Sequence, residues 1–409
     1  MTQPKFEPEF FKNNRRRLLE SIARDIPVAI AANGLIQRGA DSSYGFSQDA
    51  NFWYLTGIND PDIILVMDSG REFLIVPIRE GARVIFDGQI DETRLAGISG
   101  VSDIVNEASG WKRLDAILAR TSRLATPAPA APFIEQFGMY SNPARGRFIE
   151  RLHRHVSELQ LFDIRPDMAR LRMIKQGPEV EAIKAAVNIT VDTLKEVLGR
   201  PYGSYGFEYQ LEADITRGFR YRGADGHAFE PIVAGGKRAC VLHNVTNANI
   251  LSPGELVVMD VGAGFCGYAA DITRVMPTAV PTKRQKEVFS AVKEAHAYAL
   301  SLLGPGTHLR GYENKVARFV GNKLKQLKVT TNLTQAAIRQ YFPHATSHYL
   351  GLNVHDAGDY QKPLAPGTVL TVEPGIYLPQ EGIGVRIEDD VLITESGIEV
   401  LSRGLPIRL

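Results

Sequence analysis

Residues 255–276 decide the fold of this 409-residue chain, and they read ELVVMDVGAGFCGYAADITRVM. Both ends of the stretch are apolar and β-branched, while three glycines lie between them, which is typical of two strands joined by a glycine-rich connection. We expect the chain to reverse near Phe265 and Cys266. Asp260 and Asp271 would then lie opposite each other on one face of an antiparallel pair, with Cβ atoms about 4.5–5.5 Å apart. Taken alone, the two acids also fit an ordinary surface hairpin, but without a cation between them they would repel each other.

Three segments further along the chain supply similar side chains. Residues 342–356 read FPHATSHYLGLNVHD and hold three of the nine histidines. Residues 370–377 (LTVEPGIY) and 384–394 (GVRIEDDVLIT) each place an acid inside a run of Val, Leu and Ile. Such an acid is costly to bury unless a cation or a hydrogen-bond donor meets it. With a period of two, Glu388 shares a side with Arg386, which we expect to orient or neutralise it.

Four acids and one histidine from these segments form a candidate metal site. Together they carry about four negative charges at neutral pH, which would balance two divalent cations. Carboxylate and imidazole ligands suit Mn²⁺, Co²⁺, Fe²⁺ or Zn²⁺, and two metals about 3.5–4 Å apart recur in enzymes that activate water. We therefore predict a metallohydrolase whose ligands are Asp260, Asp271, His348, Glu373 and Glu388.

Length, charge and cysteine content exclude several other classes of protein. The chain is long enough for two domains that each bury a core. Its formal net charge is +1, and positive and negative residues are interspersed along the chain. Binding to nucleic acid or to an anionic membrane is therefore not expected. With only Cys240 and Cys266, neither a disulfide framework nor a cysteine zinc site is available. No apolar run has the length of a membrane span or a signal peptide, so we expect a cytoplasmic enzyme.

The pattern of apolar residues predicts an α/β fold in two domains. Residues 26–85 alternate short apolar runs with turn residues, as in a domain built on a sheet. The proline- and alanine-rich stretch 125–132 reads as a surface loop, and Arg165-Pro166 begins the expected linker, which gives domains over residues 1–165 and 166–409. In the second domain, pairs of helices precede strands twice, as in an internal repeat; the helices are expected from Pro178, at 207–221, at 283–303 and at 310–327.

These motifs resemble those of the M24 metallopeptidases, whose catalytic domain has the pita-bread fold. The resemblance rests on the order Asp, Asp, His, Glu, Glu and on the strings MDVGAGFCGYAADITR, HATSHYLGLNVHD, TVEPGIY and GVRIEDD. Residues 15–19 (RRRLL) and 40–57 (ADSSYGFSQDANFWYLTG) look like the N-terminal domain of aminopeptidase P and prolidase. The chain departs from the family at Asn353, usually Asp, and at Phe86, near which some relatives have Trp. Asn353 is no ligand position, whereas Phe86 bears on substrate preference.

The resemblance implies an N-terminal α/β domain, a pita-bread catalytic domain with a pseudo-two-fold repeat, and the activity of aminopeptidase P. Enzymes of this kind hydrolyse the bond between an N-terminal residue and a following proline, through hydroxide held by two metals. The expected cofactor is Mn²⁺, with Co²⁺, Fe²⁺ and Zn²⁺ as alternatives. Asp271 and Glu388 would bridge the metals, Asp260 would complete one of them, and His348 and Glu373 would complete the other.

The resemblance also implies roles for side chains around the metals. Glu373 would shuttle the proton from water to the leaving nitrogen. His243, His344 and His355 would hold the substrate and stabilise the oxyanion. Because proline has no amide N–H, its ring needs a pocket of its own, for which Tyr377 and Arg386 are the candidates.

Two alternatives remain open at this point. A prolidase, which cleaves Xaa-Pro dipeptides, would have the same metals and domains, although the FWYLTG string favours aminopeptidase P. A binding module without catalysis is the second, and the presence of all five ligands argues against it, because idle buried carboxylates would be destabilising. The expected partners are proline-containing peptides and further copies of the chain in a dimer or tetramer.

Overall fold

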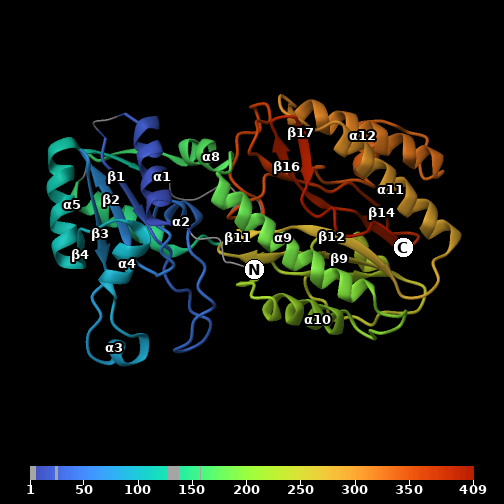
Figure 1. Cartoon of the computed structure of the whole chain (residues 1–409), viewed down its shortest axis with the longest axis horizontal. Coiled ribbons are helices and arrows are strands. Elements are labelled where there is room, and N and C mark those ends of the chain that lie inside the picture. Colours follow the sequence, from blue (N-terminus) through green and yellow to red (C-terminus); the bar gives the residue numbers. More distant parts are fainter. Residues whose placement is uncertain (1–5, 24–25, 128–137, 157) are drawn as a thin grey trace. The chain divides into compact units, whose positions relative to one another are not determined.

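The computed structural model describes residues 6–23, 26–127, 138–156 and 158–409. They form two compact units, one that ends at Leu171 and one that runs from Arg172 to Leu409 (Figure 1). The boundary expected at residues 165 and 166 lies at the start of helix α8 (Arg165–Arg172). Helices and strands alternate in both units, which confirms the predicted mixed α/β class.

The first unit is built on a six-stranded sheet. Its strands lie in the order β4 (Ile104–Asn106), β3 (Arg71–Val76), β2 (Ile64–Asp68), β1 (Val28–Ala31), β5 (Arg123–Thr126) and β6 (Gln160–Asp163). Strand β2 is antiparallel to both of its neighbours, and the other pairs are parallel. The described helices are α1 (Pro8–Ser21), α2 (Ala50–Thr56), α3 (Ala82–Asp87), α4 (Glu92–Ser99), α5 (Glu107–Thr121) and α7 (Pro143–His155).

The two N-terminal strings that carry the family resemblance form packed elements of this unit. Arg15 is buried on α1, where its guanidinium pairs with Glu72 of β3 at 2.7 Å and donates to two main-chain carbonyls. Asp49 caps the N-terminus of α2, and Gly57 ends that helix in the left-handed conformation, with φ 68°. Of the predicted loop at 125–132, the first two residues end β5, and residues 128–132 lie outside the described part.

The second unit repeats the order of two helices followed by strands. Helices α9 (Gly177–Leu198) and α10 (Glu208–Tyr221) precede β7 (Gly226–His227), β8 (Ile232–Gly235), β9 (Leu256–Val261), β10 (Ala263–Phe265), β11 (Tyr268–Ala269) and β12 (Ile272–Pro277). Helices α11 (Lys283–Ser301) and α12 (Leu309–Gln326), with short α13 (Gln335–Arg339), precede β13 (Val369–Val372), β14 (Gly375–Leu378), β15 (Ile383–Arg386), β16 (Asp389–Thr394) and β17 (Gly397–Val400). In Figure 1 the strands of this unit lie between the two helix pairs.

The four long helices have the amphipathic character that the sequence predicts. On α9 the stripe of Ile183, Val187, Val191 and Leu194 is buried. On α11 and α12 the buried positions belong to one large apolar cluster, which also contains the inner residues of β8, β9, β13, β15 and β16. This core holds the strand ends that carry the acids.

The predicted hairpin exists, but its register is two residues away from the expected one. Strand β9 pairs antiparallel with β12 so that Asp260 lies opposite Thr273, not opposite Asp271. The chain reverses at Cys266 and Gly267, both with positive φ, between the paired residues Phe265 and Tyr268. Asp260 and Asp271 therefore share a face as diagonal neighbours, because the two-residue turn centres the hairpin one residue later than expected.

Candidate metal centre

Four of the five predicted ligands, the acids, lie at or beside the ends of strands in the second unit. Asp260 lies in β9, Asp271 directly precedes β12, Glu373 directly follows β13, and Glu388 directly precedes β16. His348 comes from the segment before Tyr349, a residue that forms an isolated bridge with Leu370 of β13. The apolar strand pattern that flanks each acid thus holds its backbone, while the acid itself emerges at the end of the ladder.

The structure brings these side chains together. The Nε2 atom of His348 lies 3.4 Å from Oδ2 of Asp271 and 3.5 Å from Oε1 of Glu373. Possible ligand atoms of Asp271, His348 and Glu388 all lie within 4.8 Å of one another. Asp260 lies close enough to these side chains for its charge to raise the pKa of Asp271, Glu373 and Glu388.

The acids are buried beside one another, and this proximity shapes their protonation. Burial and then the neighbouring carboxylates raise the pKa of Asp271 and of Glu388 well above the usual range. Burial raises the pKa of Glu373 to about 7, against the opposing charge of His348. The Oδ1 atoms of Asp260 and Asp271 are buried without a hydrogen-bond partner among the described residues. A cluster of crowded acids with unused oxygens is the donor set that divalent cations bind.

Arg386 lies within this cluster. It contacts Asp260 directly but reaches Glu388 only through another side chain. Its Nη2 forms an ion pair with Asp260, and its Nη1 donates to the hydroxyl of Tyr377 at 2.8 Å. Its Nε donates to Oγ1 of Thr273 at 3.0 Å, and that hydroxyl donates to Glu388 at 2.6 Å. The expected pairing of Arg386 with Glu388 is therefore indirect, through Thr273.

Three of the four remaining predicted site residues are histidines, and they differ in how they are held. His344 is engaged at both nitrogens, with Nε2 2.8 Å from the Tyr377 hydroxyl and Nδ1 2.8 Å from the carbonyl of Ala345. The ring of His355 lies edge-on to His348, with centroids 4.3 Å apart. Burial, His348 and His243 lower the pKa of His355 to about 4, and burial and Arg386 lower the pKa of His344 to about 3. Both rings are therefore neutral near pH 7. His243 is exposed and lies close enough to His355 to influence its pKa.

Several residues around the site escaped the sequence analysis. Asp390 accepts the main-chain N–H of Asp271 at 3.0 Å, and Thr273 links Arg386 to Glu388. Glu313 of α12 accepts two N–H groups of the segment before His348. The acid pair after Glu388 was visible as charge inside an apolar run, whereas neither Thr273 nor Glu313 stands out from its local sequence.

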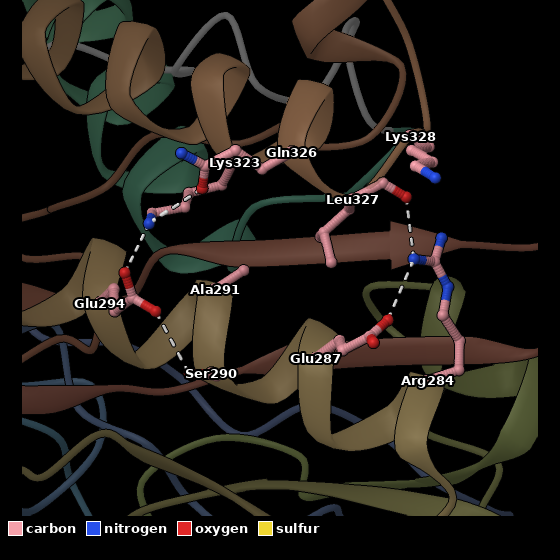
Figure 2. A pocket seen from close by; sticks show the side chains of 9 residues that line it. All are labelled: Arg284, Glu287, Ser290, Ala291, Glu294, Lys323, Gln326, Leu327 and Lys328. Carbon is pink, nitrogen blue, oxygen red and sulfur yellow. Dashed lines mark hydrogen bonds and ion pairs between the residues drawn. The ribbon is translucent and has the colours of Figure 1, made fainter.

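A separate groove lies between α11 and α12, and Figure 2 shows the side chains that line it. Its cavity volume is about 420 Å³, and none of the predicted site residues lines it. Its charges pair with each other: Lys323 with Glu294 at 2.5 Å, and Arg284 with Glu287 at 3.8 Å and with the carbonyl of Leu327 at 2.8 Å. Most of the charged groups that line the groove are thus paired with one another, and exposed Lys328 is the exception among the lining residues.

Comparison with known proteins confirms the resemblance that the motifs suggested. Residues 11–124 match the family described as aminopeptidase P, N-terminal domain, and residues 181–395 match metallopeptidase family M24. The Xaa-Pro aminopeptidase of Haemophilus influenzae is 32% identical, over 98% of this chain and 96% of its own. The Xaa-Pro aminopeptidase of Escherichia coli is 31% identical, over 96% and 94% of the two chains.

Solved structures give the same result. A putative aminopeptidase P from Bacillus anthracis superposes with a TM-score of 0.91, at 28% identity and over 98% of this chain and 96% of its own. Zinc-substituted E. coli aminopeptidase P, in complex with product, has a TM-score of 0.88 at 28% identity, over 99% and 97% of the chains. Among the described helices, none is long and apolar enough to cross a membrane. The chain belongs to the M24 metallopeptidases and carries the N-terminal domain of aminopeptidase P.

Proposed function

We propose that this protein is a metal-dependent aminopeptidase that hydrolyses the bond between an N-terminal residue and a following proline. The observation that carries the proposal is the buried cluster of acids around His348, which lies on the strands that the M24 family match covers. Relatives that align with nearly the whole chain are named Xaa-Pro aminopeptidases, which favours this activity over that of a prolidase.

The cluster fits two divalent cations, with Mn²⁺ as the first candidate and Co²⁺, Fe²⁺ or Zn²⁺ as alternatives. Asp260, Asp271, His348, Glu373 and Glu388 would hold them. Asp260 and Asp271 have unused buried oxygens, and the pKa values of Asp271, Glu373 and Glu388 are raised. When bound, such cations activate a water molecule and polarise the scissile carbonyl.

Glu373 is the candidate for moving the proton. Burial raises its pKa to about 7 in the metal-free protein, and bound cations would lower it, so that the ionised carboxylate is available as the base that general acid–base catalysis requires. Its Oε2 lies 3.5 Å from Nδ1 of His344, and its Oε1 lies 3.5 Å from Nε2 of His348, so the carboxylate stays oriented at the centre of the cluster.

The other site residues divide into inner and outer groups. Tyr377 and Arg386 are buried and form a chain of hydrogen bonds with His344, so we assign them to the orientation of Asp260. They also stay the candidates for contact with the proline ring. His243 and His355 keep part of their surface exposed and are the candidates for contact with the substrate. A neutral imidazole has one N–H to donate to a carbonyl oxygen or an oxyanion.

Paired substrates test the proposal. An aminopeptidase P leaves room beyond the proline ring, whereas a prolidase captures the proline carboxylate. We expect the Mn²⁺-loaded protein to cleave Ala-Pro-Ala with a higher kcat/KM than Ala-Pro, and chelation to abolish both activities. A tenfold preference for the dipeptide, about 1.4 kcal/mol in transition-state binding, would assign the protein to the prolidases. Activity that survives complete metal removal would overturn the metal-dependent mechanism.

We also propose that the protein forms a dimer or tetramer. On α3 of the first unit, Ile85 and Phe86 are 82% and 84% exposed, although side chains of this kind are usually covered. Light scattering on the purified protein measures the mass directly, and Phe86→Glu should shift it towards the monomer. A wild-type protein that is monomeric at micromolar concentration would contradict the proposal.

A further inference from the structure

Glu313 of α12 holds the segment that carries two of the site histidines. The main-chain N–H of Thr346 donates to its Oε2 at 2.8 Å, and that of Ser347 donates to its Oε1 at 3.1 Å. Both carboxylate oxygens are thus used by consecutive peptide groups, which lie between His344 and His348. Hydrogen bonds to an ionised acceptor are about twice as strong as neutral ones, so this carboxylate is a firm anchor.

The same segment is fixed on its other side to the strand that leads to Glu373. The N–H of Glu373 donates to the carbonyl of Thr346 at 2.9 Å, and the N–H of Thr371 donates to that of His348 at 3.0 Å. The segment therefore lies between α12 and the end of β13, and Glu313 supports it from the helix side. A shift of the segment would change the separation of His348 from Glu373, which is 3.5 Å at the nearest atoms.

The segment needs such an anchor because it is not part of a strand. Between His344 and His348 the backbone is irregular, and the isolated bridge at Tyr349 begins only beyond it. Buried N–H groups outside a ladder must find other acceptors, and Thr346 and Ser347 are both buried. A second contact from the same helix turn adds to the anchor, since the Ser347 hydroxyl donates to the hydroxyl of Tyr312 at 3.1 Å.

We propose that Glu313 is a positioning residue of the metal centre: it fixes the Thr346–Ser347 peptide, so that His348 faces the acids and His344 faces Tyr377. The inference rests on the proposed function for its catalytic part. Its metal-binding part needs only that the acid–histidine cluster binds a divalent cation. No other residue of α12 hydrogen-bonds the main chain of this segment among the described contacts.

The test compares Glu313→Gln with a matched Glu→Gln change in the same helix pair. The new side-chain amide keeps one acceptor but turns an NH₂ group towards the second N–H, so one of the two anchors is lost. Glu294→Gln removes the ion pair between α11 and Lys323 of α12 without contact to the segment (Figure 2). For each protein we would titrate the chelated form with Mn²⁺ by calorimetry, measure the melting temperature, and determine kcat and KM for Ala-Pro-Ala at saturating Mn²⁺.

We expect Glu313→Gln to weaken Mn²⁺ binding about tenfold, the lower end of the usual effect of residues that orient metal ligands. Its kcat should also fall at saturating Mn²⁺ with a smaller change in KM, because His344 shifts as well. Glu313→Asp keeps the charge with a shorter reach, so it should fall between wild type and Glu313→Gln, and it serves as the test if the latter does not fold. Glu294→Gln should match wild type in Mn²⁺ binding and kcat.

Three results would overturn the inference. The first is a Glu313→Gln variant with wild-type Mn²⁺ affinity and kcat, and the second is one that loses only thermal stability, which would mean a purely structural role. The third is an equal loss in Glu294→Gln, which would trace the effect to helix packing. A wild-type protein that binds Mn²⁺ but does not cleave Ala-Pro-Ala would instead refute the proposed function, and the Mn²⁺ titrations would still decide the role of Glu313.

Discussion

Replacement of Gly262 by alanine should damage the hairpin that carries two of the acids. A Cβ atom at this position would lie 1.6 Å from the carbonyl oxygen of Ala270, whereas real Cβ atoms do not approach closer than 3.0 Å. The obstacle is backbone, so no side-chain rotation relieves it. The two strands must move apart just where Ala270 leads into Asp271.

The cost follows from the size of this overlap. Overpacking of a buried site usually costs about 1–3 kcal/mol, and a clash with backbone belongs at the upper end, so we expect about 3 kcal/mol. For a unit of this size, each kcal/mol lowers the melting temperature by about 2–4 °C, which predicts a loss of roughly 10 °C. Because Asp271 moves away from Asp260, Mn²⁺ binding should weaken as well.

The same hairpin provides the control. A Cβ atom at Gly264 would meet its nearest neighbours at 3.8 Å, which is ordinary van der Waals contact. Gly264→Ala should therefore change the unfolding free energy by no more than about 0.5 kcal/mol. Differential scanning calorimetry and Mn²⁺ titration of both variants form the assay. If Gly262→Ala melts and binds Mn²⁺ like Gly264→Ala, the close approach of the two strands does not determine the geometry of the site.

Three further predictions concern the metal centre itself. Glu373→Gln keeps the volume but removes the base, so kcat should fall at least ~10²-fold with a much smaller change in KM; wild-type turnover would assign the proton shuttle to another group. His348→Ala should act through metal loss, with Mn²⁺ binding at least about tenfold weaker and activity partly restored by excess Mn²⁺; a defect that no Mn²⁺ concentration relieves would argue against a ligand role. Chelation should lower the melting temperature of the second unit more near pH 8 than near pH 5. Burial raises the pKa of Asp271 and Glu388 in the folded, metal-free protein. The stability that their protonated forms contribute is therefore present below their unfolded pKa. It is lost as the pH rises through the folded pKa. Equal melting shifts at both pH values would contradict this coupling.

The hairpin shows how far the sequence pattern reaches. Apolar and β-branched runs around a glycine-rich centre predicted both strands and placed the reversal one residue too early. The register was wrong by two residues, because it depends on the turn, and a turn with positive φ at Cys266 cannot be read from a cysteine. The shared face of Asp260 and Asp271 survived the error, since a shift by two residues preserves side-chain parity in a strand.

The site shows a similar division between what the sequence carries and what it does not. Each predicted acid ligand interrupts an apolar strand, and that local contrast made it visible. The partners of these acids have no local signal, because they are set by tertiary contacts between distant segments. Arg386 meets Asp260 across 126 residues of sequence, and Glu313 meets Thr346 across 33. The strand pattern predicted that Arg386 pairs with Glu388, because such a pattern can relate only residues that are close in sequence.

The position of Arg386 changes the charge balance of the site. Four carboxylates would balance two divalent cations, but Arg386 pairs with one of those carboxylates and adds a further positive charge within the cluster. The nearby carboxylate of Asp389 does not cancel it, because Arg274 and His296 already contact that group at 2.6 and 3.1 Å. Burial raises the pKa of the neighbouring Asp390 well above its usual range, which favours the neutral form of that carboxyl. With two divalent cations, the ligand set and Arg386 together would then carry a surplus of about one positive charge. In buried surroundings such a surplus favours an anion over a neutral molecule, that is, hydroxide over water and a negatively charged carbonyl oxygen over a neutral one. The ion pair between Arg386 and Asp260 is thus a physical reason for this site to stabilise the charge that develops during peptide hydrolysis.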